Sequence, residues 1–191
     1  MKLEHARKIQ TPLRAEVCAS LGAGDWILLS GRIYTARDQA HRRMAAAIEK
    51  GGRLPFSLSG EVIYYCGPTP ARPGRVIGSA GPTTSSRMDQ FLEKILGLGV
   101  LATIGKGERS KMAKEVFSRF GALDLVTIGG AGAYLSQRIK KCEIRLWPDL
   151  GPEAVYELWV EDFPCLVAYD ILGKDYFERR QSRGYAGLRH E

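Results

Sequence analysis

Short apolar runs alternate along this chain with stretches whose apolar residues recur every three or four positions, and this alternation constrains the fold most. Apolar runs favour β-strands, whereas the longer period is typical of a helix with one buried face. The strands are expected at Trp26–Tyr34, Val62–Tyr65, Val76–Ser79, Val100–Ile104, Leu125–Ile128, Ile144–Trp147, Val155–Val160 and Leu166–Ile171. The helices are expected at Ala36–Lys50, Ser85–Leu96 and Glu108–Phe120. Such an alternation predicts an α/β fold with parallel strand pairs.

The chain is expected to form a single domain. Its 191 residues can bury a sizeable core, and no internal repeat or Pro/Ser-rich linker divides them. Gly97, Gly99 and Gly121 stand where the C-terminal caps of the expected helices belong. The segment Leu54–Gly74 is rich in Gly and Pro and looks less regular, so its role in the fold is not predicted.

The composition is basic, with 28 Lys and Arg against 21 Asp and Glu and a formal net charge of +7. The basic residues are scattered, and they lack the interleaved aromatic residues and glycines of a surface that binds single-stranded nucleic acid. Nucleic acid is therefore not an expected partner. A solvated surface explains most of the charge, and an anionic substrate or an acidic partner is the alternative.

Neither a membrane span nor an export signal is expected. No uncharged stretch approaches the roughly 18–20 residues that a membrane-spanning helix needs, and Leu125–Gln137 is among the longest. The N-terminal sequence MKLEHARKIQ carries charges where a signal peptide would be apolar. The expected location is the cytoplasm.

The cysteines and histidines are too few and too scattered to predict a metal site within this chain. Cys18, Cys66, Cys142 and Cys165 lie far apart in the sequence and form no CxxC pair. With only three histidines besides, a zinc or iron–sulfur site built by this chain alone is not expected. Buried, reduced thiols are the simpler interpretation.

Three junctions between an expected strand and the helix after it carry hydroxyls, glycines and cationic side chains: Thr35–Asp38, Gly81–Arg87 and Gly105–Glu108. A helix N-terminus presents unpaired backbone N–H groups and a partial positive charge, so it receives anions well. Arginine adds full charge and a fork that binds carboxylates through two bonds. Because such loops gather at the carboxyl ends of parallel strands, we expect them to converge on a small, multiply charged anion.

The junctions supply the candidate site residues. Those for binding the anion are Arg37, Thr83, Thr84, Arg87 and Lys106, with Asp38 and His41 as supporting residues. Each also has an ordinary structural interpretation. The hydroxyls of Thr35, Thr83, Thr84 and Ser85 can be helix N-caps. Arg37 can pair locally with Asp38, Lys106 can be a solvated loop residue, and His41 can be a satisfied core histidine rather than a residue that orients Asp38.

Several familiar motifs are excluded. A P-loop needs Ser or Thr after its Gly-Lys pair, but Gly107 follows Lys106, so binding of a nucleoside triphosphate is disfavoured. The stretch Gly129–Gly132 lacks the full dinucleotide-binding fingerprint and predicts a tight strand-to-helix turn, with an anion site as the weaker alternative. No Ser/His/Asp triad can be assembled.

Four motifs carry a family resemblance: GDWILLSGRIYTARDQAHRR, GPTTSSRMD, IGKG and IGGAGAYL, in that order. Together they resemble the β subunit of class I, iron–sulfur-dependent hydro-lyases, a family of fumarate hydratases and L(+)-tartrate dehydratases. In some members this region is the C-terminal domain of one long chain. The resemblance covers roughly Lys8 to Phe177, so residues 1–177 are expected to form that domain, and 178–191 a basic tail.

The resemblance implies an assembly as well as a fold. The fold would be a swivelling β/β/α domain. Cysteines of an α subunit would hold a 4Fe–4S cluster whose iron acts as a Lewis acid on the substrate hydroxyl. The active site would lie between the subunits of an α2β2 heterotetramer.

The resemblance also implies residue roles, since Arg37, Thr83, Arg87 and Lys106 match positions that contact substrate. The three cations would stabilise negative charge that develops on a substrate carboxylate. Thr83 would handle the proton or simply bind substrate, because an unassisted hydroxyl is a poor base.

The expected function is therefore that of a fumarate hydratase β subunit, which hydrates fumarate reversibly to L-malate and needs its α subunit. One alternative is the β subunit of an L(+)-tartrate dehydratase. The other is a non-catalytic module that binds small anions or nucleic acid, for which the net charge is the only support.

Overall fold

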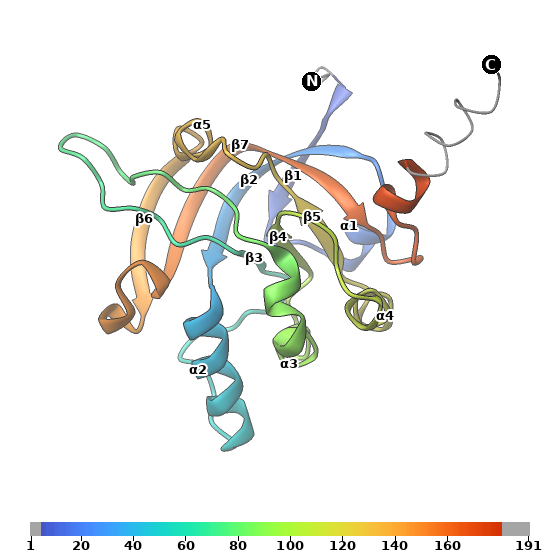
Figure 1. Ribbon diagram of the computed structural model, residues 1–191, viewed down its shortest axis with the longest axis horizontal. Coiled ribbons are helices and arrows are strands. Elements are labelled where there is room, and N and C mark those ends of the chain that lie inside the picture. The colour runs from blue at the N-terminus through green and yellow to red at the C-terminus, as the bar shows by residue number, and fades with distance from the viewer. Residues whose placement is uncertain (1–4, 181–191) are drawn as a thin grey trace, which may run out of the picture.

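One mixed sheet of seven strands organises the molecule, in the order β1-β2-β3-β4-β5-β7-β6, and a further pairing of β2 with β7 closes it into a barrel-like arrangement (Figure 1). The computed structural model describes residues 5–180. Its strands are β1 Arg7–Thr11, β2 Trp26–Thr35, β3 Val62–Tyr64, β4 Ala102–Gly105, β5 Leu123–Val126, β6 Ile139–Leu146 and β7 Val155–Tyr169. The single α/β domain expected from the sequence is confirmed.

Helices follow most of the parallel strands. The α-helices are α1 Ala15–Ala19, α2 Asp38–Glu49, α3 Leu92–Leu96, α4 Lys111–Phe120 and α5 Gly132–Ser136, and two 3₁₀ segments are η2 Ser85–Phe91 and η3 Pro148–Glu153. Residues 176–180 are also helical. Most of the basic tail expected at 178–191 falls outside the described residues. No helix within residues 5–180 is both long enough and apolar enough to cross a membrane.

The parallel pairing expected from the alternation is confirmed for β1–β2, β2–β3, β3–β4 and β4–β5. The last strand, β7, runs antiparallel to β2, β5 and β6. The prediction of two strands at Val155–Val160 and Leu166–Ile171 was wrong, because one strand of 15 residues joins them and ends at Tyr169. Polar residues and Pro164 interrupt the apolar pattern between them. A bulge at this point, where Asp162 has a φ of 47°, lets the strand continue.

Three other expectations need correction. Val76–Ser79 is not a strand but part of a loop, in which the Thr69 N–H donates to the Ser79 carbonyl. The helix expected at Ser85–Leu96 begins as the 3₁₀ segment η2. The helix expected from Glu108 begins at Lys111, because the Ser110 hydroxyl caps it by accepting from the Ala113 N–H at 3.2 Å.

The strand β1 and the helix α1 were missed because they carry little hydrophobic signal. Ile9 is the one buried residue of β1, an edge strand, and Cys18 is the one buried residue of α1. A strand of this kind is held by its backbone ladder rather than by an apolar face.

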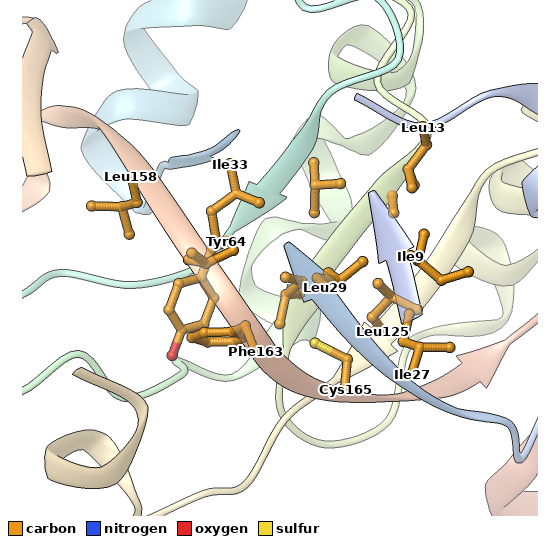
Figure 2. Packing of buried hydrophobic residues seen from close by; sticks show 14 of the residues in the cluster. Ile9, Leu13, Ile27, Leu29, Ile33, Tyr64, Leu125, Leu158, Phe163 and Cys165 are labelled. Atoms are coloured by element: carbon orange, nitrogen blue, oxygen red, sulfur yellow. The ribbon is translucent and has the colours of Figure 1, made fainter. Parts of the chain in front are cut away.

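The side chains inside the barrel form the first of two cores. Figure 2 shows β-strand residues from both ends of the chain packed together, including Ile27, Leu29 and Leu158. The rings of Tyr64 and Phe163 meet edge to face with centroids 5.3 Å apart. This core ties β7 to strands that precede it by more than a hundred residues, so the barrel closes only when the C-terminal strand is in place.

The second core lies between the barrel and the helices α2, α3 and α4, which follow the carboxyl ends of their strands (Figure 1). Its members include Met44 from α2, Met88 from η2, Ile95 from α3 and Phe117 from α4, each no more than 2% exposed. This packing fixes the first turns of α2 and η2 relative to each other. Those turns carry the candidate residues Arg37, Asp38 and Arg87.

Candidate functional site

Two of the three junctions are joined directly by backbone hydrogen bonds. The Lys106 N–H donates to the Thr83 carbonyl at 3.1 Å, and the Ser85 N–H donates to the Lys106 carbonyl at 2.9 Å. Thr84 and Lys106 thus form an isolated parallel bridge beyond the end of β4. The Thr83 N–H also donates to the Tyr65 carbonyl at 2.7 Å, just after β3. The loops after β3 and β4 therefore act as one rigid piece.

This close packing requires glycine at the end of β4. A Cβ atom on Gly105 would collide with the Ser85 hydroxyl and lie 3.0 Å from the Tyr65 ring. Gly105 therefore serves to let the two loops approach each other. The Ser85 hydroxyl is buried, and no group within residues 5–180 hydrogen-bonds to it.

The third junction joins the other two through Arg87 and Asp38. Arg87 donates from Nε and Nη2 to the two carboxylate oxygens of Asp38, at 3.1 and 2.6 Å, and from Nη1 to the Thr83 hydroxyl at 3.3 Å. A guanidinium held through two bonds has its plane fixed. Arg87 and Thr83 of one junction and Asp38 of another are therefore connected through the Arg87 guanidinium.

Arg37 reaches the same carboxylate. Its Nε lies 3.9 Å from Asp38 Oδ2, the oxygen that Arg87 contacts at 2.6 Å. Its Nη2 lies 3.6 Å from Glu153 Oε1. The Arg37 and Arg87 guanidiniums thus converge on one carboxylate instead of pointing to opposite sides of the molecule. The local pairing of Arg37 with Asp38 is present, and Arg87 shares the same carboxylate.

Lys106 and Thr84 are both exposed. The Lys106 side chain passes over Gly129, where an added Cβ would lie 3.7 Å from Cδ, and it makes no ion pair within residues 5–180. The Thr84 hydroxyl does not cap η2, and the Thr35 hydroxyl accepts instead from the Tyr156 N–H at 3.1 Å. The helix-cap interpretation is wrong for these two threonines.

His41 is buried behind the site, one turn along α2 from Arg37. Its Nδ1 lies 2.8 Å from the Arg37 carbonyl, which can only accept, so Nδ1 carries the proton and Nε2 is unprotonated. Nε2 is buried and has no hydrogen-bond partner in the described part of the chain. Burial lowers the pKa of His41 to about 4 from its ordinary value of 6.5. No hydrogen bond joins His41 to Asp38, so the histidine holds the first turn of α2 through Arg37 and stays neutral.

The low pKa of His41 predicts a pH dependence of stability. Since the folded protein binds this proton only near pH 4 and the unfolded chain near pH 6.5, the free energy of unfolding falls as the pH falls from 6.5 to 4. The contribution of His41 to that loss is about 3 kcal/mol. A His41→Gln variant, measured by urea unfolding at several pH values, is expected to lack it. Parallel pH profiles for the two proteins would contradict the assignment.

Arg109 is a buried residue that the sequence analysis missed. Its side chain is 1% exposed, and the guanidinium contacts Asp124 at 3.0 Å, Asp89 at 2.7 Å and the Ser85 carbonyl at 2.8 Å. It also donates to the Tyr65 hydroxyl at 3.0 Å. Arg109 therefore supports both loops that form the floor of the site. Its position just before α4 was visible in the sequence, but its burial was not.

The four cysteines are buried or half-buried. Within residues 5–180, no three His, Cys, Asp or Glu side chains gather closely enough to hold a metal ion. Burial raises the pKa of Cys18 to about 11, of Cys66 to about 12 and of Cys142 to about 11, and also raises that of Cys165. A cysteine binds a metal as its thiolate, and a raised pKa disfavours that form. The described residues therefore do not fit an iron–sulfur cluster.

Comparisons with known proteins give the same family as the resemblance of the sequence motifs. A family model described as the fumarase C-terminus matches residues 2–180. The chain is 40% identical to "Fumarate hydratase 1, mitochondrial" of Leishmania major over 79% of its own length, but spans only 28% of that protein. It is 36% identical to a "Putative L(+)-tartrate dehydratase subunit beta" of Methanocaldococcus jannaschii, covering 88% of this chain and 89% of the relative. It is 33% identical to the "L(+)-tartrate dehydratase subunit beta" of Escherichia coli, covering 87% and 84%.

Proposed function

Because this chain belongs to the fumarase C-terminus family, we propose that it is the β subunit of a two-subunit class I fumarate hydratase. The proposed reaction is the reversible hydration of fumarate to L-malate. The observation that carries the proposal is the convergence of Arg37 and Arg87 on one carboxylate beside the Thr83 hydroxyl. Two guanidiniums in contact with an internal carboxylate are suited to bind the carboxylate of a substrate.

The names of two relatives support the two-subunit arrangement. The chain spans 84% to 89% of two proteins named as tartrate dehydratase β subunits, and about 28% of the fumarate hydratases that it resembles. A β subunit is one chain of an assembly, so the proposal includes an α subunit. The proposal places the 4Fe–4S cluster on cysteines of that α subunit, and the assembly is proposed to be α2β2. The active site then lies where the two chains meet.

The proposed chemistry of this chain is electrostatic. Adding water across the double bond of fumarate passes through a state with negative charge next to a carboxylate, onto which that charge spreads. Cations already held in place stabilise this charge more than they stabilise the substrate, which lowers the barrier. Arg87 and Arg37 are proposed for this role, with Lys106 as the third cation at the edge of the same loops.

Thr83 is proposed to handle the proton beside the carboxylate. The Arg87 Nη1 donates to its hydroxyl at 3.3 Å, and a cationic donor at this distance favours the deprotonated form of a hydroxyl. This contact supplies the assistance that a hydroxyl needs to act as a base. The alternative is that Thr83 only donates a hydrogen bond to the substrate.

Co-expression with a cysteine-bearing α subunit tests this proposal. We expect the two chains to purify together under anaerobic conditions and to interconvert fumarate and L-malate, with neither chain active alone. Strong hydratase activity from this chain by itself would contradict the two-subunit arrangement. Salt-sensitive DNA binding without any response to dicarboxylates would instead favour a binding module.

A tartrate dehydratase β subunit is the second candidate, because the chain covers most of the length of two proteins with that name. L-tartrate carries one hydroxyl more than L-malate. A site that hydrogen-bonds this extra hydroxyl binds the analogue lacking it much more weakly. We expect the assembled pair to show a kcat/KM at least tenfold higher for L-malate than for L-tartrate. The reverse ratio would assign the chain to tartrate dehydration.

A further inference from the structure

The 3₁₀ segment η3 holds the helix α2 at two points through two acidic side chains. Asp149 accepts two hydrogen bonds from Arg43, at 3.0 and 2.6 Å, on the exposed side of α2. Glu153 accepts from the Gln39 N–H at 2.7 Å, in the first turn of the helix. The two contacts join the same pair of elements, but only that of Glu153 lies beside Arg37.

The two carboxylate oxygens of Glu153 have different roles. Oε2 accepts a hydrogen bond from the Gln39 N–H, a donor in the first turn of α2. The N-cap residue of this helix, Arg37, makes no side-chain capping bond, so Glu153 supplies one instead. Oε1 lies 3.6 Å from Arg37 Nη2. Glu153 therefore holds the turn on which Arg37 stands and also the guanidinium itself.

The surroundings of Arg37 leave little room for another orientation. An added Cβ on Gly67 would lie 2.8 Å from Arg37 Nη1 and 3.0 Å from the Pro152 carbonyl. The Arg37 side chain is 25% exposed, and its buried Nε has no hydrogen-bond partner among the residues that the structure describes. The guanidinium thus lies in a slot between the segment after β3 and the end of η3, and Glu153 is the charged group at the η3 side.

We propose that Glu153 is a positioning residue for Arg37. Its carboxylate fixes the guanidinium in the orientation in which Arg37 shares Asp38 with Arg87, so that both cations meet the same substrate carboxylate. This inference rests on the proposed function, in which Arg37 binds a dicarboxylate. A charged group held in place before binding loses less freedom when it binds, which is how a residue without substrate contact improves affinity.

Position and charge predict opposite effects for Glu153. If the residue acted only through its negative charge, its removal would make the site more positive and would strengthen the binding of a dianion. If it positions Arg37, its removal weakens that binding. The Glu153→Gln variant distinguishes the charge effect from the positioning of Arg37. Its amide oxygen can still accept from the Gln39 N–H, whereas the negative charge beside Arg37 is lost.

In the assembled pair, Glu153→Gln is expected to raise KM for L-malate about tenfold and to lower kcat as well, because Arg37 is proposed to stabilise the transition state more than the substrate. Asp149→Asn is the matched control, because it removes the other contact between η3 and α2 and is expected to leave KM within twofold. In an Arg37→Ala background, Glu153→Gln is expected to have no further effect on kcat/KM. An unchanged or lowered KM in Glu153→Gln, or an equal rise in Asp149→Asn, would overturn the proposal.

A second measurement on the full chain does not depend on activity. The buried Nε–H of Arg37, assigned in NMR spectra with an Arg37→Lys variant, is expected to exchange with solvent about tenfold faster in Glu153→Gln and at the wild-type rate in Asp149→Asn. Unchanged exchange in Glu153→Gln would overturn the positioning role. Faster exchange together with an inactive wild-type pair would support positioning and contradict the proposed function.

Discussion

Replacing Arg87 with alanine is expected to lower kcat/KM of the assembled hydratase about a thousandfold. Arg87 is bonded to Asp38 through two nitrogens and to the Thr83 hydroxyl through the third, so it links the proposed carboxylate site to the proposed proton-handling group. Removing one donor aimed at developing charge costs about 100- to 1,000-fold in rate, and Arg87 supplies a full charge as well. Steady-state kinetics with fumarate measures the loss.

Two companion variants show whether this effect belongs to the site. Arg87→Lys keeps the charge but cannot form the two-bond contact with Asp38, so it is expected to recover only part of the activity. Arg119→Ala removes a surface arginine that pairs with Glu93 at 2.6 Å, and its kcat/KM is expected to match the wild type. Near-normal kcat/KM in Arg87→Ala would remove this residue from the active site.

Replacing Arg109 with methionine is expected to lower the free energy of unfolding by about 3–5 kcal/mol. The guanidinium is buried between Asp89 and Asp124, and burial already raises the pKa of Asp124, with Arg109 opposing that rise. Without Arg109, two buried carboxylates face each other with no cation. For a chain of this size, such a loss lowers Tm by roughly 10 °C or more.

A double variant, Arg109→Met with Asp124→Asn, tests why Arg109→Met is less stable than the wild type. Since the double variant no longer buries the Asp124 charge, it is expected to be more stable than Arg109→Met alone. Arg119→Met, at the surface, is expected to leave Tm nearly unchanged. Thermal unfolding followed by circular dichroism compares all three. A wild-type Tm for Arg109→Met would show that the buried cluster contributes no net stability.

Much of the fold could be predicted because its signals are local. A run of apolar residues predicts the strand at Trp26–Thr35. The helix after it is predicted because apolar residues there recur every three or four positions. The continuity of β7 could not be predicted in this way. Pro164 and Asp162 look like the end of a strand, and only the surrounding strands β2, β5 and β6 supply the partners that continue it. Closure of the sheet is likewise a property of distant segments.

In the candidate site too, residues marked by local patterns could be predicted, whereas residues placed by distant segments could not. Arg37, Thr83 and Arg87 stand at junctions between strands and helices, and parallel pairing brings such junctions together whatever the details of the fold. Glu153 and Arg109 could not be found by this reasoning. Glu153 lies 114 residues from the Gln39 N–H that it accepts from, and no local pattern distinguishes it from other surface acids. Arg109 differs from a solvated arginine only through its burial.

The most direct measurement is a crystal structure of the assembled pair with succinate, a dicarboxylate that has no double bond to hydrate. We expect one succinate carboxylate to lie within hydrogen-bond distance of both Arg37 and Arg87, with Thr83 beside it and the remainder of the molecule facing the α subunit. Succinate bound elsewhere, with either guanidinium turned away from it, would contradict the claim that these junctions form a dicarboxylate site.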